Sequence, residues 1–190
     1  MTLEEFYEEL SHVSATRKNR LQCAEMVLKD MSLFPKLIDI MFRVDDPTSS
    51  RAAWVFEFVC EEYIYAIIPY LDIFTSNLKS VHLDSSVRPM SKVCTFIANT
   101  YFSEQPNTLK KMLKPHHKER IIEASFDWLI KDEKVAPKAY AMETLYLFGK
   151  EYSWINPELA QILEQDYATQ SAAYKARAKH ILKKIKKQLG

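Results

Sequence analysis

Glycine is almost absent from this chain of 190 residues: only Gly149 and Gly190 occur. Two isolated glycines cannot build the glycine-rich loops that hold nucleotide phosphates, and a turn-rich β protein needs many more of them. A large excess of charge of either sign is also missing, since the formal net charge is +1. The chain therefore has no overall electric field that would attract nucleic acid or an anionic membrane.

Cysteine is scarce as well, and no apolar run approaches the length of a membrane span. The three cysteines, Cys23, Cys60 and Cys94, form no C-x-x-C pair and lie in apolar helical stretches. We expect them to be buried free thiols, and we expect no metal site and no cofactor. The acidic segment 1–10 lacks the apolar region of a signal peptide. These features predict a cytoplasmic protein with no membrane partner.

Helical periodicity is the pattern that the sequence does contain. The hydrophobic fraction of 47% suits one domain, residues 1–190, with a sizeable core. The β-branched alternation of strands is absent, so we expect an all-α fold. The expected helices begin near Thr2, Ser32, Asp46 and Pro69, or cover about 14–29, 87–102, 115–131, 136–148, 157–167 and 170–189.

Several of these helices carry recognisable starting signals or apolar faces. Thr2 and Glu5 have the spacing of a capping box. Asp46 before Pro47 and Asn156 before Pro157 are typical of a cap followed by a first-turn proline. The second helix is expected to bury Leu21, Ala24 and Leu28, and the third to bury Leu37, Ile40, Met41 and Val44. The clearest apolar face comprises Ala52, Val55, Phe56, Val59 and Tyr63.

The first half of the chain shows a repeat of 34 residues. Four pairs share this offset: Arg17 with Arg51, Pro35 with Pro69, Leu37 with Leu71, and Cys60 with Cys94. Such a period predicts stacked helical pairs, about five in all, with an insertion around residues 103–117. In each pair an outer helix opens near proline and an inner helix opens near a basic residue. Those basic residues are Arg17, Arg51, Arg88, Lys138 and Lys175.

The segments 45–54 and 67–71 resemble the repeats of HEAT or armadillo-like α-solenoids. That family also has a proline-led first helix, a short turn with aspartate and a basic, alanine-rich second helix. The resemblance implies a right-handed superhelix whose second helices line a concave, binding face. We therefore expect a non-enzymatic scaffold that binds a protein or peptide there. The candidate binding residues are Arg51, Trp54, Glu57, Glu61, Arg88, Lys92 and Lys138.

Trp54 has two interpretations within this hypothesis. As a functional residue it is an aromatic anchor, with Glu57 and Glu61 meeting a cationic partner. As a structural residue it packs against the next repeat, which is the interpretation that the sequence favours.

Two other functional classes stay open. A second comparison is with the HEAT-like DNA alkylation-repair glycosylases, which hold DNA with Trp, Asp and Arg in a concave groove, although no residue-by-residue motif match supports it. Trp54, Arg51, Arg88 and Lys138 are the residues that such a groove would use, although a near-neutral charge predicts weak phosphate binding. The segment 84–92 resembles the serine loop of the adenylosuccinate lyase superfamily. Ser85, Ser86 and Pro89 match that loop, whereas Arg88, Ser91 and Val93 stand where it has Met, Lys and Asn.

The same segment also has the pattern of a helix start, in which Asp84 or Ser85 caps the helix and the serines have a structural role. His116 and His117 are adjacent on a helix, so we expect solvated side chains that do not share a metal.

The last helix is strongly basic and forms an end cap of the stack, either for an anionic partner or simply as a solvated end. Its lysines are Lys179, Lys183, Lys184, Lys186 and Lys187.

Overall fold

The computed structural model describes residues 1–189, which contain eleven α-helices and no strand. This confirms the all-α prediction. The helices are α1 (Leu3–Ser11), α2 (Arg17–Lys29), α3 (Phe34–Met41), α4 (Pro47–Glu62), α5 (Leu71–Asn77), α6 (Asp84–Tyr101), α7 (Thr108–Met112), α8 (Pro115–Ile130), α9 (Val135–Phe148), α10 (Ile155–Asp166) and α11 (Ala172–Leu189). None of these helices is both long and apolar enough to cross a membrane.

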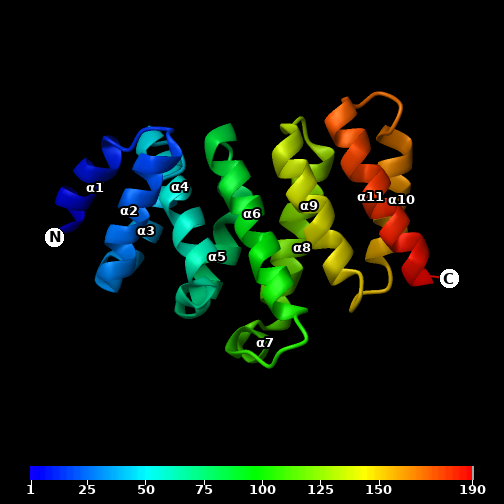
Figure 1. Cartoon of the computed structure of the whole chain (residues 1–190), viewed down its shortest axis with the longest axis horizontal. Coiled ribbons are helices and arrows are strands. Elements are labelled where there is room, and N and C mark those ends of the chain that lie inside the picture. Colours follow the sequence, from blue (N-terminus) through cyan, green and yellow to red (C-terminus); the bar gives the residue numbers. More distant parts are fainter. Residues whose placement is uncertain (190) are drawn as a thin grey trace.

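The helices form two layers that follow the chain along the long axis of the molecule (Figure 1). Helices α2, α4, α6, α9 and α11 pack against one another in that order, and we call them the first row. Helices α3, α8 and α10 pack on the first row from the other side, and α5 packs on α8. Each helix of the first row thus contacts its neighbours in the stack, as expected for helical pairs.

Two predicted caps are confirmed, and those at Ser32, at Asn156 and at the start of α6 are wrong. The Thr2–Glu5 capping box is present, and the Asp46 side chain accepts from the backbone N–H of Thr48. Ser32 is not a cap, because Asp30 accepts from its backbone N–H and begins a short 3-10 turn before α3. Asn156 is buried in the first turn of α10, which begins one residue earlier with no side-chain cap.

The core confirms the main apolar face of α4 and corrects the face of α2. Phe56 is fully buried, and its ring centroid lies 5.5 Å from that of Phe34 and 5.6 Å from that of Phe74. Tyr63, expected on the same face, is 50% exposed because α4 ends before it. In α2 the buried residues are Cys23, Ala24 and Val27, while Leu21 is exposed.

The connecting segments differ from the prediction in three places. The segment 103–117 holds a helix that the sequence pattern did not indicate, α7, capped by Asn107. Pro69 lies inside a 3-10 helix, Ile64–Tyr70, and α5 begins after it. Val44 lies in the turn after α3. Of the basic residues expected near the starts of the inner helices, Arg17 is the first residue of α2, whereas Arg51 and Arg88 stand about one turn inside α4 and α6.

Candidate functional site

The starts of α6 and α9 meet α2 and α4 at a cleft of about 300 Å³, which we call the Trp54 cleft. No side chain caps α6 or α9, so no side chain satisfies the first backbone N–H groups at these two helix starts. Unsatisfied donors and the helix dipole both favour a negative group at such a position. The cleft is lined by Ala15, Arg20, Trp54, Asp84, Ser85, Arg88, Lys134, Ala136 and Pro137.

Trp54 forms one wall of this cleft, and it has features of both a packing residue and an exposed aromatic residue. Its Nε1–H donates a hydrogen bond of 2.9 Å to the backbone carbonyl of Ser85, which ties α4 to α6 as a packing residue would. The ring is still partly exposed, and the guanidinium of Arg20 lies 5.7 Å from its centroid. Arg20 also lies over the ring of Phe58 at 5.6 Å. The cleft therefore combines aromatic surface with a cation.

Arg20 is the cation that sequence patterns missed. Burial and the positive charge of Arg88 lower the pKa of Arg20, although the group stays charged at neutral pH. Arg20 makes no ion pair with a carboxylate of the described residues; its Nε–H donates to the carbonyl of Thr16 at 3.4 Å. The signal that would have found it is the spacing of Arg17 and Arg20, three residues apart on one side of α2.

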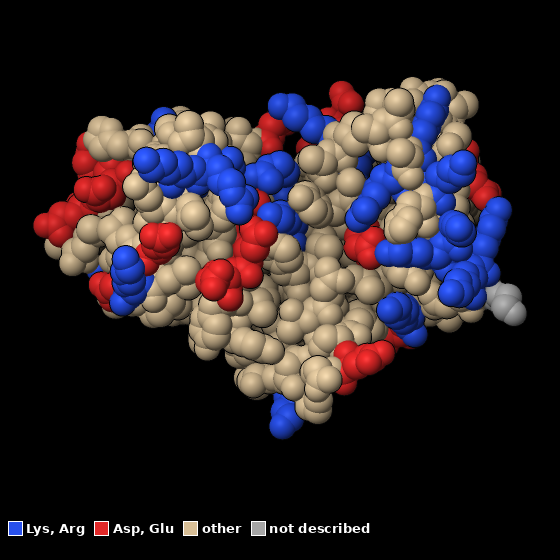
Figure 2. Space-filling model, viewed as in Figure 1, with Lys and Arg blue, Asp and Glu red and all other residues tan. Residues whose placement is uncertain are grey.

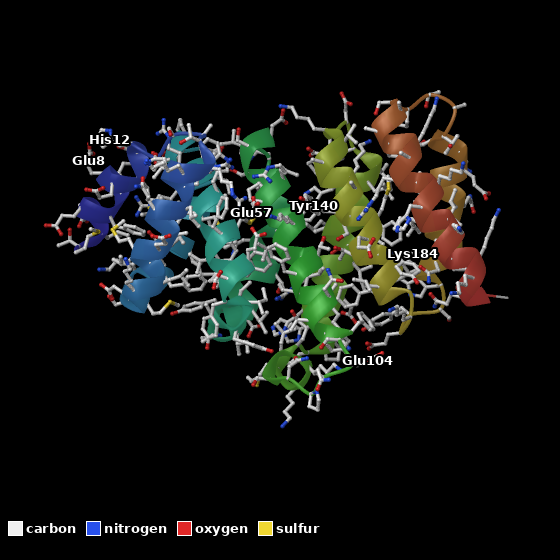
Figure 3. The ribbon with its side chains drawn as sticks, viewed as in Figure 1. Glu8, His12, Glu57, Glu104, Tyr140 and Lys184 are labelled. Atoms are coloured by element: carbon white, nitrogen blue, oxygen red, sulfur yellow. The ribbon has the colours of Figure 1, made fainter. Side chains whose placement is uncertain are left out.

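Glu57 lies between α4 and α6, where it joins two cations of α6 (Figure 3). Its side chain is 3% exposed, and its carboxylate oxygens lie 2.7 Å from Arg88 Nη2 and 2.9 Å from Lys92 Nζ. Lys92 also reaches Glu61 at 3.1 Å. Burial alone would lower the pKa of Lys92, but the hydrogen bonds and charges of Glu57 and Glu61 raise it. Because Glu57 is buried and paired, it does not face outward to meet a cationic partner.

The remaining candidates of the first row are less accessible than expected. Lys138 is 5% exposed in α9, and Arg51 is partly buried in α4. Neither lines the Trp54 cleft, and neither makes an ion pair with a described residue. The structure therefore brings Trp54 and Arg88 together in the cleft, keeps Glu57, Glu61 and Lys92 in the network beside it, and leaves Arg51 and Lys138 outside it.

The basic end cap divides into two parts. Lys184 lies against α9, where it and Arg177 hold the same carboxylate, Glu143, at 2.8 Å and 3.2 Å (Figure 3). Lys179, Lys183 and Lys186 instead line a groove of about 590 Å³ between α10 and α11, beside Tyr167 and Leu182. Lys187 is exposed and lines neither feature. Lys184 thus joins α11 to α9, and the other lysines form a solvated end.

His116 and His117 converge, contrary to the prediction from their adjacency. Both Nε2 atoms reach one carboxylate oxygen, Asp72 Oδ1 on α5, at 2.8 Å and 2.9 Å. The rings meet because His117 turns into the core, whereas His116 stays partly exposed. These contacts lower the pKa of Asp72 to about 2, mainly through hydrogen bonds from His116 and His117.

The three ligand atoms of this cluster lie within 4.8 Å of one another, which is close enough for a shared metal ion. The tautomer of His117 opposes that use. Its Nδ1 accepts from the backbone N–H of Lys114 at 3.2 Å, so in the neutral ring the proton is on Nε2, which donates to Asp72. A metal on Nε2 needs the opposite tautomer, with Nδ1–H donating to an acceptor. The cluster is therefore arranged to join α5 to α8.

The serines of the lyase-like segment lie at a helix start, but not as caps. Leu83 occupies the cap position of α6, and its side chain makes no capping hydrogen bond. Ser86 is buried, and its hydroxyl pairs with that of Ser50 at 2.9 Å, while Ser85 presents its carbonyl to Trp54. Among the described residues, no histidine lines the Trp54 cleft.

The cysteines are free and buried, as predicted. Burial raises the pKa of Cys23 to about 11 and raises the pKa of both Cys60 and Cys94 well above the usual value. None of the three is a reactive thiolate at neutral pH.

Comparison of the chain with protein-family models, curated proteins and solved structures found no match.

Proposed function

We propose that the protein is a non-enzymatic scaffold with the HEAT-like, right-handed arrangement that its sequence resembles. In this proposal the first row is the concave face, and it binds an extended segment of another protein in the cytoplasm. Helices that pack with their neighbours in chain order, and an elongated two-layer shape, support the assignment to this architecture (Figure 1).

The distribution of charge on the first row is the observation that favours a protein partner over a nucleic acid. Basic side chains gather in two groups on this face, one over α2 to α6 and one over α11, with uncharged surface between them (Figure 2). Each group contains a carboxylate that holds two cations: Glu57 holds Arg88 and Lys92, and Glu143 holds Arg177 and Lys184. A nucleic acid backbone requires a continuous basic track, whereas separated and partly neutralised groups suit a protein surface.

The Trp54 cleft suggests which part of a partner enters it. Arg20 and Lys134 are two cations of the cleft lining, which also includes first-turn residues of α6 and α9, two helices that no side chain caps. Within the described part of the chain, the one ion pair of Lys134 is with the exposed side chain of Asp84, at 3.1 Å, and such a pair exchanges readily for a ligand. An Asp or Glu side chain of the partner fits this chemistry, because a carboxylate accepts from a guanidinium and from backbone N–H groups.

The test uses a fluorescein-labelled ten-residue peptide of alternating Glu and Ala, measured by fluorescence anisotropy. We expect Arg20→Gln to weaken binding by roughly tenfold, because it removes a charge-assisted hydrogen bond. The matched control is Lys18→Gln, which removes an exposed cation from the same helix and should leave binding unchanged. Equal effects of the two variants would contradict the proposal, since the peptide would then sense only overall charge.

The alternative of a DNA-binding, alkylation-repair-like module is tested in the same experiment. A duplex of about 20 base pairs replaces the peptide at physiological salt. Tighter binding of the duplex than of the peptide, together with loss of that binding in Arg20→Gln, would favour this alternative. A pull-down with the wild type and Arg20→Gln then identifies the natural partner of the cleft.

A further inference from the structure

A second cavity, of about 500 Å³, lies on the second layer, away from the Trp54 cleft. We call it the α8 pocket, because most of its lining comes from α8 and the rest from the loop before α10. Its lining includes three acidic and three aromatic residues: Glu119, Glu123, Asp127, Phe126, Tyr152 and Trp154. No sequence pattern pointed to this combination, since the loop residues and α8 are brought together only by the fold.

Trp154 is the most informative residue of this pocket. Trp154 is 54% exposed, although tryptophan is highly buried on average in proteins. The ring stacks on Phe126, with centroids 5.8 Å apart and planes inclined by 18°. Packing against Phe126 holds one face of the indole, which leaves the rest as a flat, preformed surface. Exposed aromatic rings of this kind are common anchors of binding sites.

Three carboxylates surround the rings because Glu119, Glu123 and Asp127 are spaced four residues apart on α8. Glu123 pairs with Lys79 at 2.8 Å, and Asp127 pairs with Lys131 at 3.3 Å. Both pairs are solvated, so they exchange readily for a ligand.

Glu119 makes no ion pair or hydrogen bond through its side chain with any described residue. An acidic rim over an aromatic floor attracts a cation and repels phosphate, because the face of an aromatic ring is negative.

We propose that the α8 pocket binds an arginine side chain presented by a basic segment of a second partner protein. The guanidinium stacks on Trp154 while its N–H groups donate to Glu119 and, after exchange of the local lysines, to Glu123 or Asp127. Arginine fits better than lysine because its planar, weakly hydrated cation stacks on an indole and donates in a fork. The two sites have opposite charge preferences, so the proposal for the α8 pocket can be tested independently of the proposal for the Trp54 cleft.

The experiment measures binding of a ten-residue peptide of alternating Arg and Gly by isothermal titration calorimetry. We expect Trp154→Ala to weaken binding by about tenfold, because the stacking surface is lost. Glu119→Gln should weaken it by several fold, whereas Glu4→Gln, an equal charge change on α1, should leave it unchanged. The lysine counterpart of the peptide should bind more weakly. Since Trp154 is half exposed, the melting temperature of Trp154→Ala should stay close to that of the wild type.

Two outcomes would overturn this proposal. Arginine-peptide binding that is equal in the wild type, Trp154→Ala and Glu119→Gln would show that the peptide senses only diffuse charge. Concentration-dependent dimerisation that Trp154→Ala abolishes, seen by sedimentation velocity, would show that the occupant is a second copy of this chain and not a basic partner segment.

Discussion

At the scale of single residues, Glu57 has the largest consequences for the candidate site. Its buried carboxylate sits between two cations of the next helix, so it fixes where Arg88 and Lys92 stand beside the Trp54 cleft. A buried ion costs free energy to desolvate and is tolerated only while its partners remain. Removing the charge therefore leaves two partly buried cations with too little negative charge nearby.

We predict that Glu57→Gln lowers the free energy of unfolding by roughly 3 kcal/mol, as expected when one partner of a buried ion pair is removed. Glu61→Gln is the matched control, because Glu61 pairs with the same Lys92 but is 41% exposed. That change should cost less than about 1 kcal/mol. Urea denaturation of both variants measures the difference, and equal losses would show that burial of Glu57 does not matter.

We predict that Phe56→Ala lowers the free energy of unfolding by roughly 3–5 kcal/mol, because it opens a cavity between Phe34 and Phe74. Tyr63→Ala provides the comparison, since the sequence placed it on the same apolar face but it is half exposed. We expect it to cost far less. A Phe56→Ala variant as stable as the wild type in urea would contradict the assignment of the core.

Residue patterns identified Phe56 but not Arg20 or Trp154, and the reason is physical. A buried face repeats every 3.6 residues within one helix, so local sequence reports it. Binding residues come from several helices, and their meeting depends on packing. Arg20 reaches the cleft because α2 turns Cys23, Ala24 and Val27 inward, whereas its sequence predicted a different face.

At the scale of helices, the contact of α5 with α8 depends on a histidine that resists protonation. Burial lowers the pKa of His117 below its ordinary value, and the charges of His116 and Lys114 act in the same direction, against Asp72. Its Nδ1 faces a backbone N–H, so a second proton on the ring would break that hydrogen bond. Protonation is therefore easier in the unfolded chain than in the folded protein.

We predict that stability falls on acidification below about pH 6.5. The reason is that His117 binds a proton more readily in the unfolded chain than in the folded protein. The loss continues as the pH falls toward the lowered pKa of the folded state. His117→Gln should flatten the drop in melting temperature between about pH 7.5 and pH 5.5. His180→Gln, a change at an exposed histidine of α11, should leave that drop unchanged. A variant with the wild-type pH profile would show that another group titrates.

Helix identity was predictable for the long, amphipathic segments and less so for their ends and for short turns. The boundaries of α8 and α9 lie within a few residues of the prediction, because both follow recognisable breaks. The 3-10 helix around Pro69 and the short α7 were missed, since turns of this length carry little periodicity and are stabilised by tertiary contacts. Asn156 was misread as a cap because a cap and a buried first-turn asparagine have the same local sequence.

At the scale of the whole molecule, the two ends carry opposite charge despite a net charge of +1. Acidic side chains cover the end formed by α1, and basic side chains cover the end formed by α11 (Figure 2). Long-range attraction of a polyanion is therefore confined to one end of the protein and is countered at the other.

We predict that duplex DNA binds weakly, only to the α11 end, and is released as salt rises from about 50 to 200 mM. Neutralising Lys179, Lys183, Lys186 and Lys187 together should remove the binding, while Lys184 is kept because it holds Glu143. Fluorescence anisotropy over this salt range measures it. Tight binding that survives the four substitutions would place the nucleic-acid site elsewhere on the first row, away from α11.

The linear stacking of the helices gives the protein a direction along which it transmits force. The first and last helices lie at opposite ends of the long axis (Figure 1), so a pull between the chain's two ends loads every interface of the first row in series. Helices in a one-dimensional stack are held only by their neighbours and detach one after another. Tethered at both ends, the protein would act as an extensible spacer that lengthens in steps under modest tension. The ion pairs of Glu57 and Glu143 would be among the contacts that break at individual steps.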